Sequence, residues 1–373
     1  MSVSIVTVKS RAQLRKFIHF PAILYKDCEN WVPALEGDEF DTFNPKKNGA
    51  YEYCEAECYL AFRDGRIAGR VAAIINHRAN DIWKEEIVRF GWLDFIEDQE
   101  VLNALLNAVV DFGKARGCTR IKGPWGFTDM DKEGALVEGY ENLSPFTCLY
   151  NFPYYDTMLK AAGLEKDVDW TQRVVKIGET MPSMFQYAGL VEKRYGLHMA
   201  RCSTTREFCD KYGMDIFHLY NDTFAPLCEF CPITDKQIKD YLDTYVPILN
   251  PDFVAVCLNE EEKPVGFAFC VPTLSKAVKK SRGKLFPFGF VRILRAIRHN
   301  DTLEALLIGV LPEYQGKGAN ILLFKYIHEN CLKFGIKRMI LNPQLEENFK
   351  VQTLFDQYET VPFMRRRAYS KVL

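Results

Sequence analysis

The stretch Glu304-Ala-Leu-Leu-Ile-Gly-Val-Leu-Pro-Glu-Tyr-Gln-Gly-Lys-Gly-Ala-Asn320 decides the fold of this 373-residue chain. Its first part, up to Leu311, is a short apolar run before glycines, which predicts a strand buried on both faces. The glycines then open a helical pattern whose apolar positions are Ile321, Phe324, Ile327, Cys331 and Phe334. A strand, a glycine loop and a helix in this order predict an anion site, because loop N–H groups and the helix dipole converge there.

The loop differs from two well-known phosphate-binding loops. Gly316 and Gly318 would let a phosphate approach the backbone closely, since they carry no side chains. The loop lacks the Gly-Lys-Ser/Thr ending of a nucleotide P-loop, and no third glycine follows as in dinucleotide-binding folds. The alternative interpretation is a glycine-capped turn in some other α/β domain.

The segment Val310-Leu-Pro-Glu-Tyr314 and the loop Gln315-Gly-Lys-Gly318 resemble a family signature. The family is the GNAT superfamily of acyl-CoA N-acyltransferases, where Arg/Gln-x-x-Gly-x-Gly/Ala follows a strand ending Val-x-Pro-x-Tyr. The sixth position here is Asn320 instead of Gly or Ala, which would crowd a pyrophosphate. The resemblance implies acetyl-CoA or a longer acyl-CoA as cofactor, bound by Val310, Gln315, Gly316, Lys317, Gly318, Ala319 and Asn320.

The resemblance also implies catalytic groups. Glu304, six residues before Val310, looks like the general base of the histone-acetyltransferase branch, and strand alternation predicts that both side chains share one face. Many family members end with Asn-x-x-Ala-x-x-x-Tyr, whose tyrosine protonates the thiolate. Here Asn348 matches, and Phe355 stands at the tyrosine position, so both are expected beside the cofactor. Tyr358, about one helical turn later, is the candidate acid.

Several alternatives stay open for this chemistry. Glu304 can also be a strand-end carboxylate in water, and the thiolate can leave unassisted or take its proton from water. Phe355, which has no proton to give, can instead mark a protein that binds acyl-CoA or a lipid without turnover. A purely structural role is disfavoured because the glycine loop is intact. The leading hypothesis is transfer of an acyl group from coenzyme A to an amine.

Two halves of the chain repeat one order of elements: a hairpin, a strand, a helix closed by glycine, and a strand running into a proline. The first half places them at 58–75, 89–96, 101–116 and 119–122, and the second at 253–271, 304–311, 319–334 and 336–341. Such repetition predicts an α+β fold with mixed sheets, built as two tandem GNAT-like domains at 1–180 and 181–373. The alternative is one such domain with an unrelated partner.

The two copies differ at the connection from strand to helix. The first copy has Glu97-Asp-Gln-Glu100 there, without a glycine. These carboxylates can cap the helix and would repel a pyrophosphate. We therefore predict that the first copy has lost cofactor binding.

A glycine-rich loop, Gly123–Gly139, with Asn151–Tyr155 after it, resembles a group of bacterial tandem GNAT-like proteins of similar length without an established substrate. The loop carries Trp125, Phe127 and a row of acids, and such loops often shape ligand pockets. The alternative is an ordered connection with its aromatic residues tucked into the core.

An insertion, Lys276–His299, separates the second hairpin from its next strand. It contains basic residues and then the apolar helical pattern of 286–298. Basic residues beside an apolar helix face favour contact of 284–298 with a membrane surface or a fatty chain. The alternative is a helix that packs on its own domain and exposes its arginines to water.

Composition and charge limit the other functions that this chain could have. The net charge of −1 provides no global field that would recruit nucleic acid. The N-terminus resembles no signal peptide, and no apolar run approaches the roughly 20 residues of a membrane span. The twelve cysteines are therefore expected to be reduced in a cytoplasmic protein. Cys228 and Cys231 form a lone CxxC without the second pair that zinc requires, so no metal site is predicted.

Overall fold

The computed structural model describes residues 2–202, 204–245 and 249–373. Within this part the chain divides into two units. Unit 1 contains Met1–Thr171, Ser275–Arg292 and Met364–Leu373, and unit 2 contains Gln172–Leu274 and Ile293–Phe363. Each unit is a mixed sheet with helices on both faces, which confirms the predicted α+β class.

The sheet of unit 1 begins with a meander of antiparallel strands. The meander comprises β1 (Ser4–Thr7), β2 (Cys54–Arg63), β3 (Arg66–Asn76) and β4 (Ile87–Phe95), and β5 (Arg120–Gly123) follows it in the sheet. The β2–β3 hairpin turns through Asp64 and Gly65, both with positive φ, as the Asp-Gly pair predicts. β5 runs parallel to β4, and residues 369–372 of the last strand, β14 (Thr360–Val372), pair with β5.

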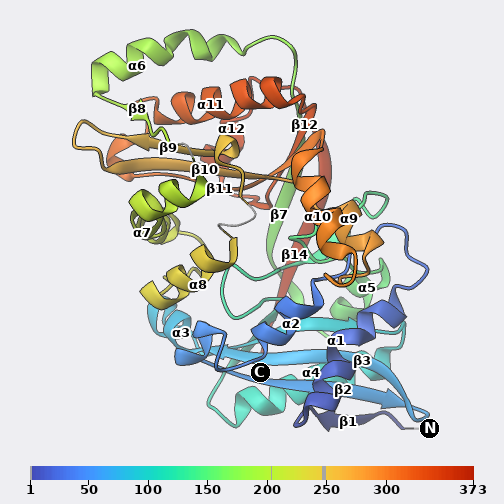
Figure 1. The fold of residues 1–373 in the computed structure, drawn as a ribbon. Helices are drawn as coiled ribbons and strands as arrows, with labels where there is room; N and C mark the ends of the chain where they lie inside the picture. The colour runs from blue at the N-terminus through green and yellow to red at the C-terminus, as the bar shows by residue number, and fades with distance from the viewer. Residues whose placement is uncertain (1, 203, 246–248) are drawn as a thin grey trace. The chain divides into compact units, whose positions relative to one another are not determined.

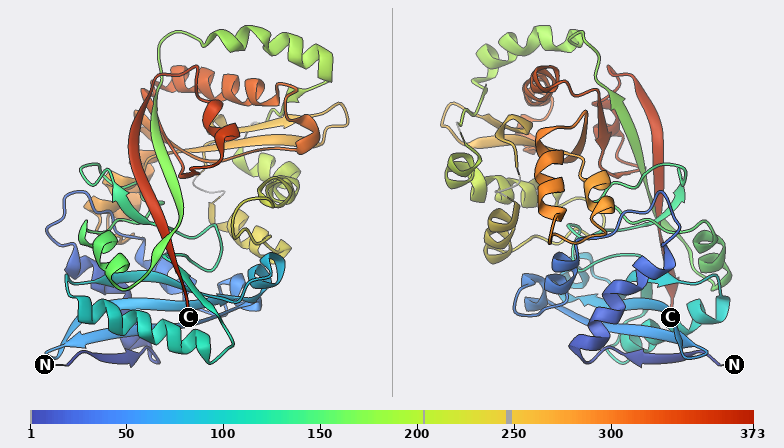
Figure 2. Two further views of the ribbon diagram at one scale, coloured as in Figure 1. Left: turned by 180° about the vertical axis from the view of Figure 1, so that it is seen from behind. Right: turned by 45° about the vertical axis from the view of Figure 1, so that its right-hand side comes forward.

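Helices cover both faces of this sheet (Figure 2). α4 (Gln99–Lys114) packs on one face with the alternate β3 residues Val71, Ala73 and Ile75. α1 (Arg11–Leu24) packs on the other face with Ala72 and Ile74. The opposite placement follows from strand alternation, because successive side chains of β3 point to opposite faces. The other elements of unit 1 are α2 (Glu36–Thr42), η1 (Gly49–Glu52), α3 (His77–Trp83), β6 (Ala135–Glu138), α5 (Tyr154–Ala161) and α9 (Ser275–Lys280).

The sheet of unit 2 has the same plan. Its strands are β8 (His198–Met199), β9 (Val254–Leu258), β10 (Pro264–Pro272), β11 (Thr302–Val310) and β12 (Arg338–Leu341). β9, β10 and β11 are antiparallel, and β12 runs parallel to β11. Residues 174–176 of β7 (Glu165–Lys176) pair with the other side of β12.

Two long helices flank the sheet of unit 2 on opposite faces (Figure 1). α11 (Ala319–Phe334) packs with Ala268 and Ile308, and its Leu323 and Ile327 enter the same core. α7 (Thr205–Phe224) lies on the other face. The remaining elements are η2 (Ser183–Tyr187), α6 (Ala188–Tyr195), α8 (Asp235–Tyr245), η4 (Pro251–Phe253), α10 (Gly289–Arg298, shared with unit 1), η5 (Pro312–Tyr314), β13 (Gln344–Leu345) and α12 (Phe349–Thr353).

Candidate active site

A bulge interrupts β11 at Leu306. On β10, Phe269 faces Leu307 while the next residue, Cys270, faces Ala305, so Leu306 has no opposite residue. Unit 1 has a similar irregularity in β4 beside Trp92, whose φ is +48°. A bulge bends a strand and changes which side chains share a face, and bulges are frequent beside active sites.

The two parallel strands of unit 2 part just after this bulge. β12 pairs with β11 only from Thr302 to Ala305, and the last backbone hydrogen bond joins the N–H of Asn342 to the carbonyl of Ala305 at 3.0 Å. Within the described chain, residues 307–310 therefore pair with β10 alone, and Leu306 has no opposite residue on either neighbouring strand. Their other edge offers backbone N–H and C=O groups to an extended ligand.

The glycine loop lies directly beyond this open edge. Gly316 and Gly318 have φ of +74° and +85°, a conformation that favours glycine. A Cβ on Gly318 would lie 2.6 Å from Val191 Cγ2, whereas a Cβ on Gly316 would meet no described atom within 4 Å. Gly318 is thus required for packing against α6, and Gly316 leaves open space above the loop.

The start of α11 provides donors for an anion. Gly318 is the N-cap of this helix and no side chain caps it, so the N–H groups of Gly318, Ala319 and Asn320 have no intrahelical acceptor. The side-chain amide of Gln315 donates to the carbonyl of Val310 at 3.1 Å and closes the loop onto β11. Lys317 Nζ lies 5.0 Å from the Tyr314 ring centroid, which leaves a positive charge beside the loop. These groups suit a phosphate or pyrophosphate.

Glu304 does not share a face with Val310, so that prediction is wrong. The bulge at Leu306 reverses the alternation: Glu304 lies opposite Val271, on the face of Phe267 and Gly309. A Cβ on Gly309 would lie 2.6 Å from Thr223 Oγ1 of α7, so this is the α7 face of the sheet. The alternative of a strand-end carboxylate in water does not describe Glu304, because this residue is only 2% exposed.

Thr273 is the neighbour of Glu304 that sequence patterns did not reveal. Its hydroxyl donates to Glu304 Oε1, and its backbone is held by Asn300 Nδ2 and by the carbonyl of Thr302. A threonine just after a strand has no special signal in the sequence. The pairing arises only because β10 and β11 are antiparallel neighbours.

The other predicted residues lie on the α11 face. Asn348 accepts from the N–H of Val351 at 3.3 Å and caps α12, while Phe355 is buried against Phe324. The ring of Tyr358 lies 5.8 Å from the ring of His328. His328 comes ten residues after Gly318, so Tyr358 lies roughly 15 Å along α11 from the glycine loop. Burial raises the pKa of Tyr358. The structure therefore brings neither Phe355 nor Tyr358 to Glu304, and a role of Tyr358 as an acid stays a prediction.

His328 is a buried histidine on α11. It is 2% exposed, and neither ring nitrogen has a hydrogen-bond partner among the described residues. Burial lowers its pKa, so the unfolded chain takes up a proton first as pH falls, near 6.5.

We therefore expect unit 2 to lose stability as pH falls below about 6.5. The His328→Phe variant should remove part of this loss, whereas His198→Gln, at an exposed histidine paired with Glu262, should keep it. Urea unfolding followed between neutral pH and pH about 5.5 measures the effect. Identical pH slopes for wild type and His328→Phe would contradict this assignment.

The first copy carries a capped helix where the second has its open loop. Asp98 Oδ1 accepts from the N–H groups of Glu100 and Val101 at 3.0 and 3.3 Å, and Arg63 pairs with Asp98 and Glu100. The predicted carboxylate cap is thus confirmed. Loss of cofactor binding by this copy remains a prediction.

Removing this cap tests the assignment of the two copies. The Asp98→Ala variant should lower the stability of unit 1 by about 1 kcal/mol, because two helix N–H groups lose their acceptor. Its affinity for CoA should be unchanged. Denaturation and calorimetry measure the two quantities, and weaker CoA binding would place cofactor contacts in the first copy.

The aromatic residues of the loop 123–139 pack against other parts of unit 1. Trp125 and Phe127 are 1% and 0% exposed. The Asp131 carboxylate accepts from the N–H groups of Phe127 and Thr128, and burial raises the pKa of Asp131 to about 6. The ordered connection with buried aromatic residues thus describes this loop.

Comparisons with known proteins identify the fold. No family model matches the chain. A tandem GNAT protein from the clavulanic acid biosynthesis pathway aligns with a TM-score of 0.58 at 11% identity, over 100% of this chain and 98% of that one. The chain has the tandem GNAT fold. A GCN5-related N-acetyltransferase from Sphaerobacter thermophilus also carries the GNAT fold, with a TM-score of 0.53 at 9% identity over 99% and 95% of the chains.

Two curated proteins are similar to this GNAT-fold chain along its whole length. Protein YghO of Escherichia coli K12 is 24% identical over 375 residues, covering 98% of this chain and 94% of that protein. The bacterial ceramide synthase of Caulobacter vibrioides is 24% identical over 380 residues, covering 100% and 98%. The predicted resemblance to tandem GNAT proteins is thus confirmed for the fold.

Proposed function

We propose that this protein transfers an acyl group from acyl-CoA to an amine, and that its second copy performs the reaction. The main observation in support is that the β12-facing edge of residues 306–310 is unpaired in the described chain. The uncapped N–H groups at the start of α11 follow it. The space above Gly316 would admit the pyrophosphate, and the edge strand would hold the extended arm of the cofactor. A backbone N–H near Val310 would polarise the thioester carbonyl.

Glu304 would act as the base in this proposal. Amines are protonated near neutral pH and must lose a proton before they can attack a carbonyl carbon. The carboxylate of Glu304 would accept that proton, directly or through a water, while the Thr273 hydroxyl holds its Oε1. The bulge aims Glu304 at the α7 face, so the amine would approach from that face.

We further propose that the amine belongs to a long-chain amino alcohol and that the acyl group is a fatty acyl group. The name of the Caulobacter relative supports this class, since a ceramide is the amide of a fatty acid with a long-chain amino alcohol.

The test compares acceptors and donors on the full chain. Palmitoyl-CoA or acetyl-CoA is mixed with sphinganine or with ethanolamine, and products are identified by mass spectrometry. We expect the sphinganine amide from palmitoyl-CoA as the main product. Amide formation from ethanolamine alone would retain acyl transfer and reject the long-chain acceptor.

Phe355 favours a second candidate, a protein that binds acyl-CoA without turnover. Its buried ring stands at the position where many relatives of this fold have a proton donor. Stoichiometric binding of palmitoyl-CoA without any amide, across a broad panel of amines, would establish this second candidate.

A further inference from the structure

We propose that the segment Ser275–His299 docks the protein on an anionic membrane surface. It contains α9 and α10, which Figure 1 shows joined by a short connection. The proposal adds to the function above and does not depend on it, because membrane binding is measured without acyl transfer. No helix in the described ranges has the length and apolar character needed to cross a bilayer, so the contact would be peripheral.

Charge is the first argument. Residues 275–299 hold eight of the 48 Lys and Arg residues of the chain and none of its 49 Asp and Glu residues, whereas the whole chain has a net charge of −1. Lys284 lies 4.0 Å from Glu36. In the described part of the chain, Arg282, Arg295 and Arg298 form no ion pair with a carboxylate. These charges are thus available for lipid phosphates.

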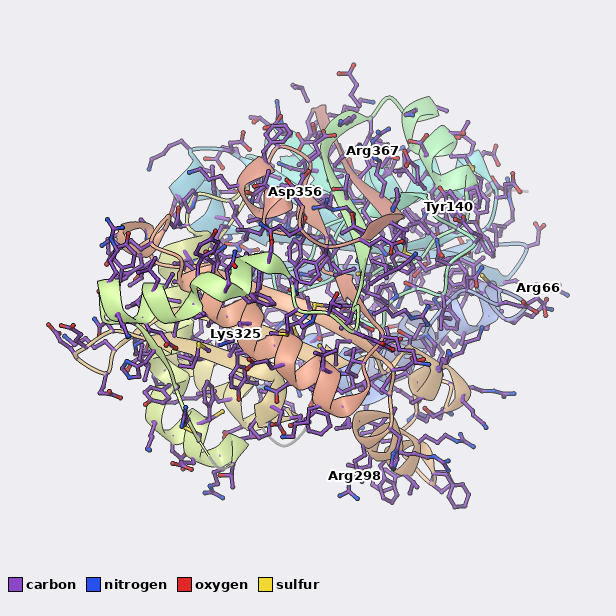
Figure 3. The ribbon with its side chains drawn as sticks, turned by 90° about the horizontal axis from the view of Figure 1, so that it is seen from above. Arg66, Tyr140, Arg298, Lys325, Asp356 and Arg367 are labelled. Atoms are coloured by element: carbon purple, nitrogen blue, oxygen red, sulfur yellow. The ribbon has the colours of Figure 1, made fainter. Side chains whose placement is uncertain are left out.

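Exposed apolar side chains at the tip of the segment are the second argument. Phe286 and Phe288 are 78% and 66% exposed, and four apolar residues near them are less exposed: Leu285, Phe290, Val291 and Leu294. On α10, Phe290 and Leu294 are four residues apart and so share one side, which Arg298 extends. In Figure 3, Arg298 lies on the outside at the end of α10, clear of α11, which carries Lys325.

The base of the segment is fixed while its tip is exposed. Lys279 Nζ donates to the carbonyl of Glu29, and the N–H of Glu36 donates to the carbonyl of Gly283 at 2.9 Å. Gly283 has φ of +72°, and a Cβ there would lie 2.2 Å from the carbonyl oxygen of Ala34. These contacts hold the connection against the rest of unit 1, so the phenylalanines project without costly ordering on binding.

A bilayer fits these features better than a protein partner does. Phenylalanines partition into the boundary of headgroups and acyl chains, while neighbouring arginines reach the phosphates. Each Lys or Arg close to an anionic surface contributes about fivefold to binding. A cluster of basic charges without acids around an apolar tip is the pattern of a peripheral membrane anchor.

The experiment is flotation of the full chain with vesicles of phosphatidylcholine, alone or mixed with phosphatidylglycerol. We expect strong binding to the mixed vesicles, weak binding to the neutral ones, and loss of binding as salt rises. Phe286→Ser with Phe288→Ser should weaken binding by about tenfold or more, and Arg295→Gln with Arg298→Gln by a similar factor.

Two matched controls separate this surface from general effects. Phe334→Ser with Phe349→Ser removes two exposed phenylalanines elsewhere, and Arg206→Gln with Lys239→Gln removes two exposed charges elsewhere. Both should bind vesicles like the wild type. The proposal is overturned if the wild type does not float with mixed vesicles at low salt, or if the controls lose as much binding as the segment variants; a protein partner would then be the alternative.

Discussion

Replacing Gly316 with valine is expected to weaken CoA binding by about a hundredfold or more. A Cβ at Gly316 would meet no described atom within 4 Å, so the valine would project into the open space where we propose that the pyrophosphate binds. Loss of even two hydrogen bonds to a charged phosphate accounts for this factor. Isothermal calorimetry with CoA measures it.

Gly335 provides a matched control for this substitution. Its φ is +69° against +74° for Gly316, and a Cβ on it also meets no described atom within 4 Å. The Gly335→Val variant should therefore suffer the same left-handed strain, about 1–2 kcal/mol of stability, while CoA binding stays intact. Equal loss of CoA affinity in both variants would show that strain, and not blockage of the loop, is responsible.

The Glu304→Gln substitution is expected to lower the single-turnover rate of acyl transfer by a factor of about 10² to 10⁴. The amide keeps an oxygen that can accept from the Thr273 hydroxyl, so the fold should be retained, but it takes up no proton. CoA affinity should be unchanged. A pH–rate profile that differs between the wild type and the variant would report this proton acceptor.

Two comparisons make this result specific. Glu313→Gln changes an exposed glutamate in η5 and should leave the rate and its pH dependence intact. Tyr358→Phe tests the remaining acid candidate. Full activity of Glu304→Gln with an unaltered pH profile would refute the base assignment while leaving CoA binding at the loop standing.

Local sequence signals predicted much of this architecture. The glycine spacing from Gln315 to Asn320 predicted the loop and the start of α11, since positive φ and uncapped helix N–H groups are properties of a few neighbouring residues. The same holds for the Asp98 cap and the turn at Asp64 and Gly65. The boundary near residue 180 stays a prediction.

By itself, the sequence determined the repeated α+β plan, the glycine loop of the second copy and its capped counterpart in the first. Only the tertiary structure decided the direction of Glu304, because one unpaired residue in β11 reverses a strand's alternation and depends on the register with β10. It likewise placed Tyr358 beside His328 and gave residues 364–373 to unit 1. Such contacts join residues that are far apart in sequence, so no local sequence pattern predicts them.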